Sequence, residues 1–390
     1  MPLGHPAKRR RGSVFRVAGL NSLMHSPGRF LNRRDQLRRT FEADLVDGAL
    51  VSSPTNVSYL TDFRGDASFL IVGKERDLLI SDGRFTSQIE QECPGLEAHI
   101  RPVAQSMIEA VADVVAKSGM KSLTFETGSM LVSDFDELRE ATAGVDWVGR
   151  ADRVEELRQI KDELEIEELR EAIRIAERAF AMVRAGLRAE DTEKDAADAL
   201  EGYLRRCGAT SASFPPIVAV GQRSALPHAW PTSTSRIGDA DFVLIDWGAT
   251  AAQYRSDLTR VIVTGKVTPT FEKVYRTVLA AQERGIAAIR PGVRGSEVDA
   301  EARSVIEEAG FGGFFNHGLG HGIGMEIHEA PRIRNGSEAI LQPGMVVTVE
   351  PGIYLPDWGG IRIEDDVLVT PDGCEILTHV AKTPDSVRLE

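Results

Sequence analysis

Two pairs of acidic residues lie in segments whose composition is typical of β-hairpins. In DADFVLIDWGATAAQYRSDLTRVIVTG, apolar runs flank a centre of small residues, and Asp246 and Asp257 are symmetric about the midpoint between Ala251 and Ala252. A turn at that midpoint would place the two aspartates directly opposite each other, with Cβ atoms about 4.5–5.5 Å apart. Carboxylates this close repel each other unless a proton or a cation lies between them. By itself, the pair fits either a metal site or an ordinary hairpin with exposed acids.

The segment MVVTVEPGIYLPDWGGIRIEDDVLV repeats this arrangement. Glu350 and Glu364 are symmetric about Asp357, which lies in a Pro-Asp-Trp-Gly-Gly turn region. A second hairpin would again place two carboxylates opposite each other. Two such pairs in one domain are much harder to attribute to chance than one, so we predict a cation site.

Three histidines lie close together between the two acidic pairs. His317, His321 and His328 occur in HGLGHGIGMEIHEAP, where frequent glycines disfavour a regular helix and allow backbone to approach a ligand closely. This cluster predicts a binding site. A fourth, His228, stands in SALPHAWPT, where prolines on both sides favour an extended loop. Taken alone, His228 also fits an ordinary surface histidine.

Together, these residues offer four carboxylates and one or more imidazoles. Oxygen-rich donors with a minority of nitrogen suit manganese, cobalt, zinc or iron better than a structural zinc. Four negative charges would balance two divalent ions, as in two-metal hydrolases.

The elements that position these residues fall into two predicted domains. In residues 34–153, strands such as ASFLIVG, DLLISDG and SLTFE alternate with helical segments such as FTSQIEQEC, and residues 54–56 predict a turn between a strand and a helix. Residues 154–187 predict two helices with a break near residues 161–163. Long β runs then dominate, broken by the helices FEKVYRTVLAAQERGIAAI and SEVDAEARSVIEEAG. We expect residues 154–390 to form the catalytic domain.

Residues 1–33 predict a disordered extension. It is basic at residues 8–11, and no apolar stretch follows, so it does not have the pattern of a secretory signal.

Composition limits the class of protein. A chain of 390 residues suggests two domains, and a net charge of -13 argues against general nucleic-acid binding. The sequence has no apolar run long enough to cross a membrane. Its three cysteines, Cys93, Cys207 and Cys374, form no CxxC pair, which indicates a reducing compartment, and we expect a cytoplasmic location.

The chain resembles the pita-bread metallopeptidases, in particular the bacterial branch with Xaa-Pro aminopeptidase (aminopeptidase P) and prolidase. The resemblance covers roughly residues 34–380. It rests on ALPHAWPT, LIDWGA, YRSDLTR, HGLGHGIGMEIHEAP, TVEPGIY and GIRIEDD, and on SPTNVSYLTDF and SDGRFTSQIEQE in the first domain. It implies a creatinase-type α/β N-terminal domain (34–153) and an α+β pita-bread catalytic domain (154–390).

The resemblance also implies residue roles. Asp257 and Glu364 would contact both ions, Asp246 would chelate one, and His321 and Glu350 would hold the other. On the substrate side, the resemblance assigns catalytic roles to His228, His317 and His328, with Arg362 supporting a ligand carboxylate.

The implied function is a dinuclear metal-dependent exopeptidase that hydrolyses the bond before proline in peptides with proline at the second position. Manganese is the expected ion, with cobalt, zinc or iron as alternatives, and a homodimer is expected. The main interpretation is an Xaa-Pro aminopeptidase. The alternatives are an Xaa-Pro dipeptidase, a related peptidase of broader specificity, and a pita-bread binding protein without catalysis. The five ligands argue against the last of these and against creatinase. The N-terminal domain argues against methionine aminopeptidase.

Overall fold

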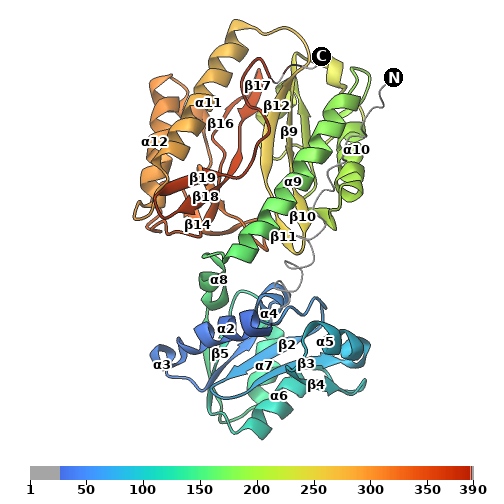
Figure 1. Cartoon of the computed structure of the whole chain (residues 1–390), viewed down its shortest axis with the longest axis vertical. Helices are drawn as coiled ribbons and strands as arrows, with labels where there is room; N and C mark the ends of the chain where they lie inside the picture. Colours follow the sequence, from blue (N-terminus) through green and yellow to red (C-terminus); the bar gives the residue numbers. More distant parts are fainter. Residues whose placement is uncertain (1–26, 387, 389–390) are drawn as a thin grey trace, which may run out of the picture. The chain divides into compact units, whose positions relative to one another are not determined.

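The computed structural model describes residues 27–386 and 388 (Figure 1). The chain divides into two compact units, one ending at Leu157 and one beginning at Arg158. Each unit is described separately. Within the described residues, no helix combines the length and apolar character that a membrane span requires.

The last residues of the predicted disordered extension are helical in the structure. Residues 1–26 lie outside the described residues, whereas residues 27–33 belong to helix α2 (Pro27–Arg38). This part is ordered by contacts with the rest of the N-terminal unit. Arg33 and Arg34 are buried, and they donate hydrogen bonds of 2.9 and 2.7 Å to the carbonyl oxygens of Tyr59 and Leu60.

The N-terminal unit is an α/β domain, as predicted. Its six-stranded sheet has the order β4-β3-β2-β1-β5-β6, in which β1–β2 and β2–β3 are antiparallel and the other pairs are parallel. Figure 1 shows α2 and α4 on one side of the sheet and α6 on the other. The strands are β1 (Gly48–Val51), β2 (Phe69–Gly73), β3 (Asp77–Asp82), β4 (Glu97–Arg101), β5 (Ser122–Glu126) and β6 (Asp146–Arg150). The other helices are α3 (Phe41–Asp44), α4 (Pro54–Thr61), η1 (Gly83–Phe85), α5 (Thr86–Glu92), α6 (Met107–Ser118) and α7 (Val132–Ala141).

The helical pair and its break occur where the sequence predicts them. Helix α8 (Arg153–Arg158) is followed by α9 (Glu163–Gly186). A capping box begins α9, because the side chain of Asp162 accepts from the backbone N–H of Glu165 while the Glu165 carboxylate accepts from that of Asp162. The capping box therefore sets the residue at which the break ends and α9 begins.

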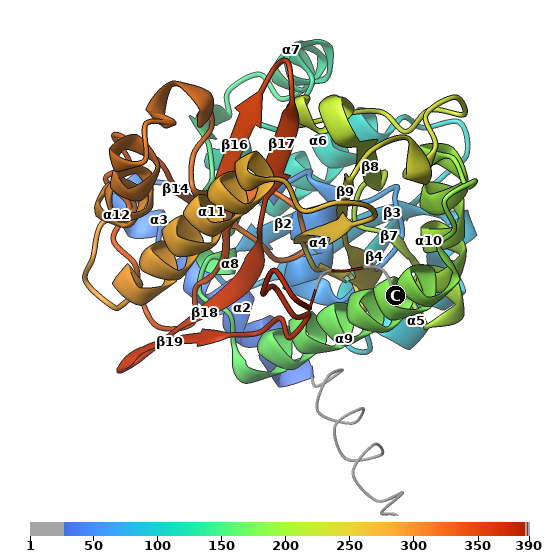
Figure 2. The same ribbon diagram turned by 90° about the horizontal axis from the view of Figure 1, so that it is seen from above.

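The C-terminal unit combines helices with largely antiparallel sheets, as expected for the α+β domain that the resemblance implies. Figure 2 shows the strands between α9 and α10 on one side and α11 and α12 on the other. The helices are α10 (Glu193–Arg206), η2 (Gly221–Ala225), η3 (Ile237–Asp239), α11 (Pro269–Ala288), α12 (Gly295–Glu308) and η4 (Gly312–Phe314). The strands of the first half are β7 (Ser211–Ala212), β8 (Ile217–Val220), β9 (Phe242–Trp247), β10 (Ala249–Ala251), β11 (Tyr254–Arg255) and β12 (Leu258–Val263). Those of the second half are β13 (Gly320–Gly322), β14 (Glu329–Ile333), β15 (Val346–Val349), β16 (Gly352–Leu355), β17 (Gly359–Arg362), β18 (Asp365–Thr370) and β19 (Gly373–Ile376).

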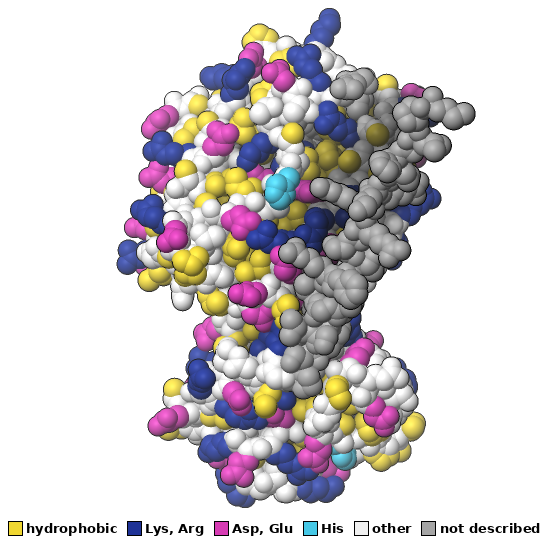
Figure 3. Space-filling view, in the orientation of Figure 1, with side chains coloured by type: hydrophobic (Ala, Val, Ile, Leu, Met, Phe, Trp, Pro, Cys, Tyr) yellow, Lys and Arg dark blue, Asp and Glu magenta, His cyan; other side chains and the backbone are white. Residues whose placement is uncertain are grey.

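Two apolar cores hold the helices against these strands. Phe180 of α9 stacks on Trp247 of β9, with ring centroids 4.2 Å apart. On the other side, Val274 and Val278 of α11 join the cluster that contains Val347 of β15. The carboxylate-bearing strands thus lie between two packed helical layers, which limits their movement. On the face shown in Figure 3, basic and acidic side chains are interspersed over both units.

Candidate metal centre and substrate pocket

The first hairpin differs from the prediction by a small shift of its turn. Asp246 pairs with Thr259, and not with Asp257 as the sequence symmetry predicted. The cause is the turn itself, because Ala252 and Gln253 both have positive φ, 47° and 74°, as a two-residue type I′ turn requires. The turn centre therefore lies one residue later than predicted, and Asp257 is diagonal to Asp246.

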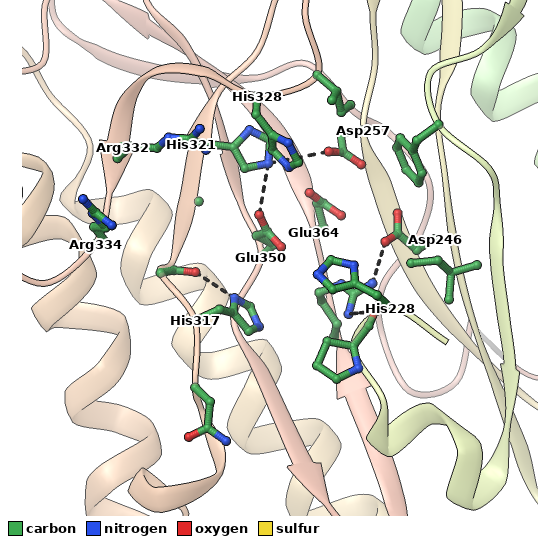
Figure 4. A pocket seen from close by; sticks show the side chains of 18 of the residues that line it. His228, Asp246, Asp257, His317, His321, His328, Arg332, Arg334, Glu350 and Glu364 are labelled. Carbon is green, nitrogen blue, oxygen red and sulfur yellow. Dashed lines mark hydrogen bonds and ion pairs between the residues drawn. The ribbon is translucent and has the colours of Figure 1, made fainter. Parts of the chain in front are cut away.

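This shift changes the partner of Asp246 but not the face that the two aspartates share. Side chains alternate along a strand with a period of two, so a displacement of two residues keeps a carboxylate on its original face. Asp246 and Asp257 therefore still point toward the same site, as Figure 4 shows.

The second hairpin has the predicted register. Val349 pairs with Asp365 on one side of the acidic pair and Gly352 with Arg362 on the other, so Glu350 is opposite Glu364. Both glutamates lie where one hydrogen-bonded ladder has ended and the next has not begun. The direct opposition of these two carboxylates is thus confirmed.

His321 completes the cluster with the carboxylates of both hairpins (Figure 4). Ligand atoms of Asp257, His321 and Glu364 all lie within 4.8 Å of one another. The Nε2 atom of His321 is 3.3 Å from a Glu350 oxygen and 3.7 Å from an Asp257 oxygen. Its Nδ1 atom is 3.0 Å from the carbonyl oxygen of Gly322, which orients the ring so that Nε2 faces the carboxylates.

The electrostatics of this cluster are those of a cation site. Burial raises the pKa of Asp257 and Glu364 well above the usual range, and neighbouring carboxylates raise it further. Burial also raises the pKa of Asp246, although Arg362 opposes the shift. Burial alone would raise the pKa of Glu350, but the hydrogen bond and charge of His321 lower it to about 2. Such a group of buried acids is stabilised by protons or by cations.

An unpaired buried oxygen atom is a second observation that fits a divalent metal at this cluster. Asp246 Oδ1 is buried and has no hydrogen-bond partner in the described part of the chain. Buried carboxylate oxygens normally have a partner, so this atom is suited to a ligand. Asp246 Oδ2, by contrast, accepts a hydrogen bond of 2.5 Å from Arg362 Nη2.

Two residues that the sequence did not single out connect the candidate ligands. Thr259 Oγ1 donates to Glu364 Oε2 (2.6 Å) and accepts from Arg362 Nε (3.1 Å). The Tyr354 hydroxyl accepts from Arg362 Nη1 and hydrogen-bonds His317 Nε2, both at 2.9 Å. The contacts of Thr259 depend on the true register of the first hairpin, and those of Tyr354 depend on how distant segments pack. The spacing of residues in the sequence therefore predicts neither role.

All nine sequence-predicted site residues line one cavity of about 830 Å³ within the C-terminal unit. His228 is exposed and lies in a turn after η2 rather than in the predicted extended loop. In Figure 4 it lies on the Asp246 side of the pocket, while His328 lies beside His321. The rings of His321 and His328 meet edge to face, with centroids 4.4 Å apart.

The two remaining histidines differ in their environment. Partial burial, together with the electrostatic effect of the neighbouring His321, lowers the pKa of His328 to about 4. Burial also lowers the pKa of His317, whose Nδ1 is 2.8 Å from the carbonyl oxygen of Gly318. Both rings are therefore neutral near pH 7 and can donate or accept one hydrogen bond at each nitrogen as their tautomer allows.

The pocket also has features that the sequence reasoning missed. Arg332 in β14 and Arg334 directly after it are exposed, they alternate with buried Pro331 and Ile333, and both line the cavity. Neither forms an ion pair with another described residue. Their signal in the sequence was the alternating pattern Pro-Arg-Ile-Arg directly after the histidine cluster. The lining also includes the apolar residues Phe214, Ile217 and Ile327.

Comparison with known proteins shows the class to which this fold and site belong. The model of Metallopeptidase family M24 matches residues 167–371, and that of the Creatinase/Prolidase N-terminal domain matches residues 33–160. The chain belongs to metallopeptidase family M24 and carries a creatinase/prolidase N-terminal domain.

Particular relatives cover nearly the whole chain. The peptidase YqhT of Bacillus subtilis is 41% identical over 348 residues, which are 89% of this chain and 98% of that protein. A solved Xaa-Pro dipeptidase from Bacillus anthracis is 39% identical, covers 91% of this chain and 99% of its own, and has a TM-score of 0.88. An X-Pro aminopeptidase from Thermotoga maritima is 37% identical, with coverages of 87% and 98% and a TM-score of 0.81.

Proposed function

We propose that this metallopeptidase is an exopeptidase that cleaves the bond before proline, with Xaa-Pro dipeptides as its preferred substrates. The observation that carries the proposal is the cavity in which the cluster of four carboxylates and His321 faces a pair of exposed arginines. The Xaa-Pro dipeptidase from Bacillus anthracis supports it, as does an Xaa-Pro dipeptidase from Pyrococcus furiosus that is 34% identical over 352 residues.

We assign the metal ligands as Asp246, Asp257, His321, Glu350 and Glu364, which would hold two divalent ions, with manganese expected. When bound, such ions supply Lewis-acid activation of water and of the scissile carbonyl. The support for two ions is the charge of four carboxylates and the raised pKa values of Asp257 and Glu364, which indicate more negative charge than the buried protein groups compensate.

The histidines act on the substrate. His328 and His228 line the pocket on its two sides, where an N–H of each can donate to the oxyanion that develops on the scissile carbonyl. The bond before proline is a tertiary amide without an N–H, so the departing proline nitrogen must receive a proton as the bond breaks. A histidine in the pocket is suited to that transfer.

The arginines account for the preference for dipeptides. In an Xaa-Pro dipeptide, the free carboxylate belongs to the proline itself, one residue beyond the scissile bond. Arg332 and Arg334 line the same cavity as the carboxylate cluster and offer guanidinium groups to such a carboxylate, and charge-assisted hydrogen bonds of this kind are strong. A longer peptide would place its carboxylate elsewhere and would lose this contact.

One set of assays tests the substrate class. The manganese-loaded protein should hydrolyse Xaa-Pro dipeptides faster than Xaa-Ala dipeptides and faster than Xaa-Pro-Xaa tripeptides. The variant Arg332→Ala/Arg334→Ala should raise KM for the dipeptide about 10-fold or more, with less effect on the tripeptide. Equal rates on Xaa-Ala would contradict the proline preference. Faster cleavage of tripeptides would favour the second candidate, an Xaa-Pro aminopeptidase, for which the Thermotoga maritima relative is the argument.

A separate measurement tests the metal content. Protein reconstituted with manganese should contain about two ions per chain by elemental analysis. Folded protein that repeatedly binds none would contradict the ligand assignment.

We further propose a homodimer in the cytoplasm. Three free thiols, Cys93, Cys207 and Cys374, fit a reducing compartment. Light scattering coupled to size-exclusion chromatography checks the dimer.

A further inference from the structure

The segment that carries His328 has no regular secondary structure of its own. Residues 323–328 run irregularly from the end of β13 to the start of β14. The first part of this segment is held by Arg255, whose backbone N–H donates to Gly324 O (2.9 Å) and whose Nε donates to Met325 O (3.0 Å). The part nearest to His328 needs another anchor.

That anchor is the carboxylate of Glu329, the residue directly after His328. It accepts from Arg158 Nη2 at 2.5 Å, from Lys161 Nζ at 3.1 Å and from the backbone N–H of Glu326 at 3.0 Å. Arg158 Nη2 also lies 3.0 Å from a carboxylate oxygen of Glu326. Arg158 therefore contacts both ends of residues 326–329, and Lys161 adds a second cation at Glu329.

These ion pairs are buried, so the loss of one partner should affect the local structure strongly. The side chains of Arg158, Lys161 and Glu329 are only 2%, 1% and 6% exposed. Burial opposes ionisation of Glu329, but the charges of Lys161 and Arg158 prevail and lower its pKa. Removing Arg158 or Lys161 leaves the buried Glu329 carboxylate with one cation instead of two, so the segment would rearrange.

Burial and lining relate this cluster to the pocket. Glu329 is the first residue of β14 and directly follows His328 in the chain. The buried Glu329 carboxylate contacts Arg158 and Lys161, while His328 lines the pocket. Arg158 and Lys161 do not line the pocket and lie about 170 residues away in sequence, at the end of α8 and between α8 and α9 respectively. The proposed chemistry gives them no direct role.

We propose that Arg158 and Lys161 are positioning residues that hold His328 in the pocket through the Glu329 carboxylate. The proposal rests on the proposed function for its kinetic readout. His328 contributes mainly when negative charge develops on the substrate, so its displacement lowers kcat more than it changes KM.

The first test is a pair of substitutions that remove charge and keep length, Arg158→Met and Lys161→Met. Each should lower kcat for an Xaa-Pro dipeptide about 10- to 100-fold, as loss of supporting partners typically does. KM and manganese content should stay close to wild type, because the assigned metal ligands are untouched. Arg158→Lys, which keeps the charge, should recover part of the loss. A variant that loses its metal, or a Lys variant as slow as Arg158→Met, would contradict positioning of His328.

A double-mutant cycle identifies the residue through which Arg158 acts. In the His328→Ala background, Arg158→Met should cause little further loss of kcat, because the group that it positions is gone. A full additional loss in that background would show that Arg158 acts elsewhere and would overturn the proposal.

Hydrogen exchange supplies a readout without catalysis. Amides of residues 323–329 should exchange faster in Arg158→Met than in the wild type. The control is Leu200→Ala in α10, a fully buried side chain outside the pocket, which should lower the melting temperature without changing exchange in this segment or kcat. Unchanged exchange in Arg158→Met contradicts the proposal whatever the substrate. A wild-type protein inactive on every Xaa-Pro peptide contradicts the proposed function alone.

Discussion

The Nε2 atom of His321 faces two carboxylates, whereas His328 stands next to it at the wall of the pocket. The two imidazoles should therefore respond differently to removal. We predict that His321→Ala lowers manganese affinity as well as turnover. His328→Ala should lower kcat about 10²–10³-fold, as loss of an oxyanion donor does, while the metal content stays nearly unchanged.

Elemental analysis and steady-state kinetics on both variants, prepared side by side, check this prediction. If His328→Ala loses as much metal as His321→Ala, the roles of ligand and catalyst have been exchanged.

Thr259 joins the carboxylate of Glu364 to Arg362, which donates to Asp246 on the other side of the candidate site. Thr259→Val keeps the shape of the side chain but leaves Glu364 and Arg362 each without one buried hydrogen-bond partner, at a cost of about 1–3 kcal/mol per group. We predict a fall in metal affinity of about 10- to 100-fold. Thr259→Ser retains the hydroxyl and is the matched control. Manganese titration by calorimetry measures the difference, and equal affinities for the Val and Ser variants would contradict it.

At the scale of elements, the first hairpin has a turn that its sequence does not favour. Ala252 has φ of 47°, a left-handed conformation that asparagine adopts more readily than alanine. We predict that Ala252→Asn raises the free energy of unfolding by about 0.5–1 kcal/mol.

Urea denaturation compares this variant with Ala104→Asn, a control at an exposed turn residue without a positive φ. A gain of the same size in the control would show that the left-handed backbone is not the cause. Metal content should be equal in both variants, because neither alanine belongs to the site.

At the scale of the whole molecule, the acidic chain of net charge -13 concentrates some of its carboxylates in one buried cluster. The raised pKa values of Asp257 and Glu364 mean that the metal-free folded protein retains protons that the unfolded chain has released. These two groups therefore lower the stability of the metal-free protein as pH rises above their unfolded pKa of about 4. A bound cation takes the place of the protons.

We accordingly predict that manganese binding releases protons and that its apparent affinity rises with pH. Titration calorimetry in buffers with different ionisation enthalpies gives the number of protons released. Proton uptake, or an affinity that falls as pH rises toward neutrality, would contradict the raised pKa values.

The sequence by itself determined the donor types of the candidate site and much of the architecture. Alternating strands and helices predicted the α/β unit, and the break before α9 follows from the capping box at Asp162. The opposition of Glu350 and Glu364 was also readable, since a single Pro- and Gly-containing turn links their strands. These features depend on residues close together in the chain.

Only the tertiary structure decided the contacts between distant segments. It set the strand partner of Asp246 through a turn in which Ala252 and Gln253 have positive φ, although neither residue type favours that conformation. It brought Thr259 to Glu364 across the two hairpins, and Arg158 to Glu329 from the segment before α9. The physical reason is that such contacts follow from how buried strands and helices pack, and packing depends on the shapes of many side chains at once rather than on spacing along the sequence.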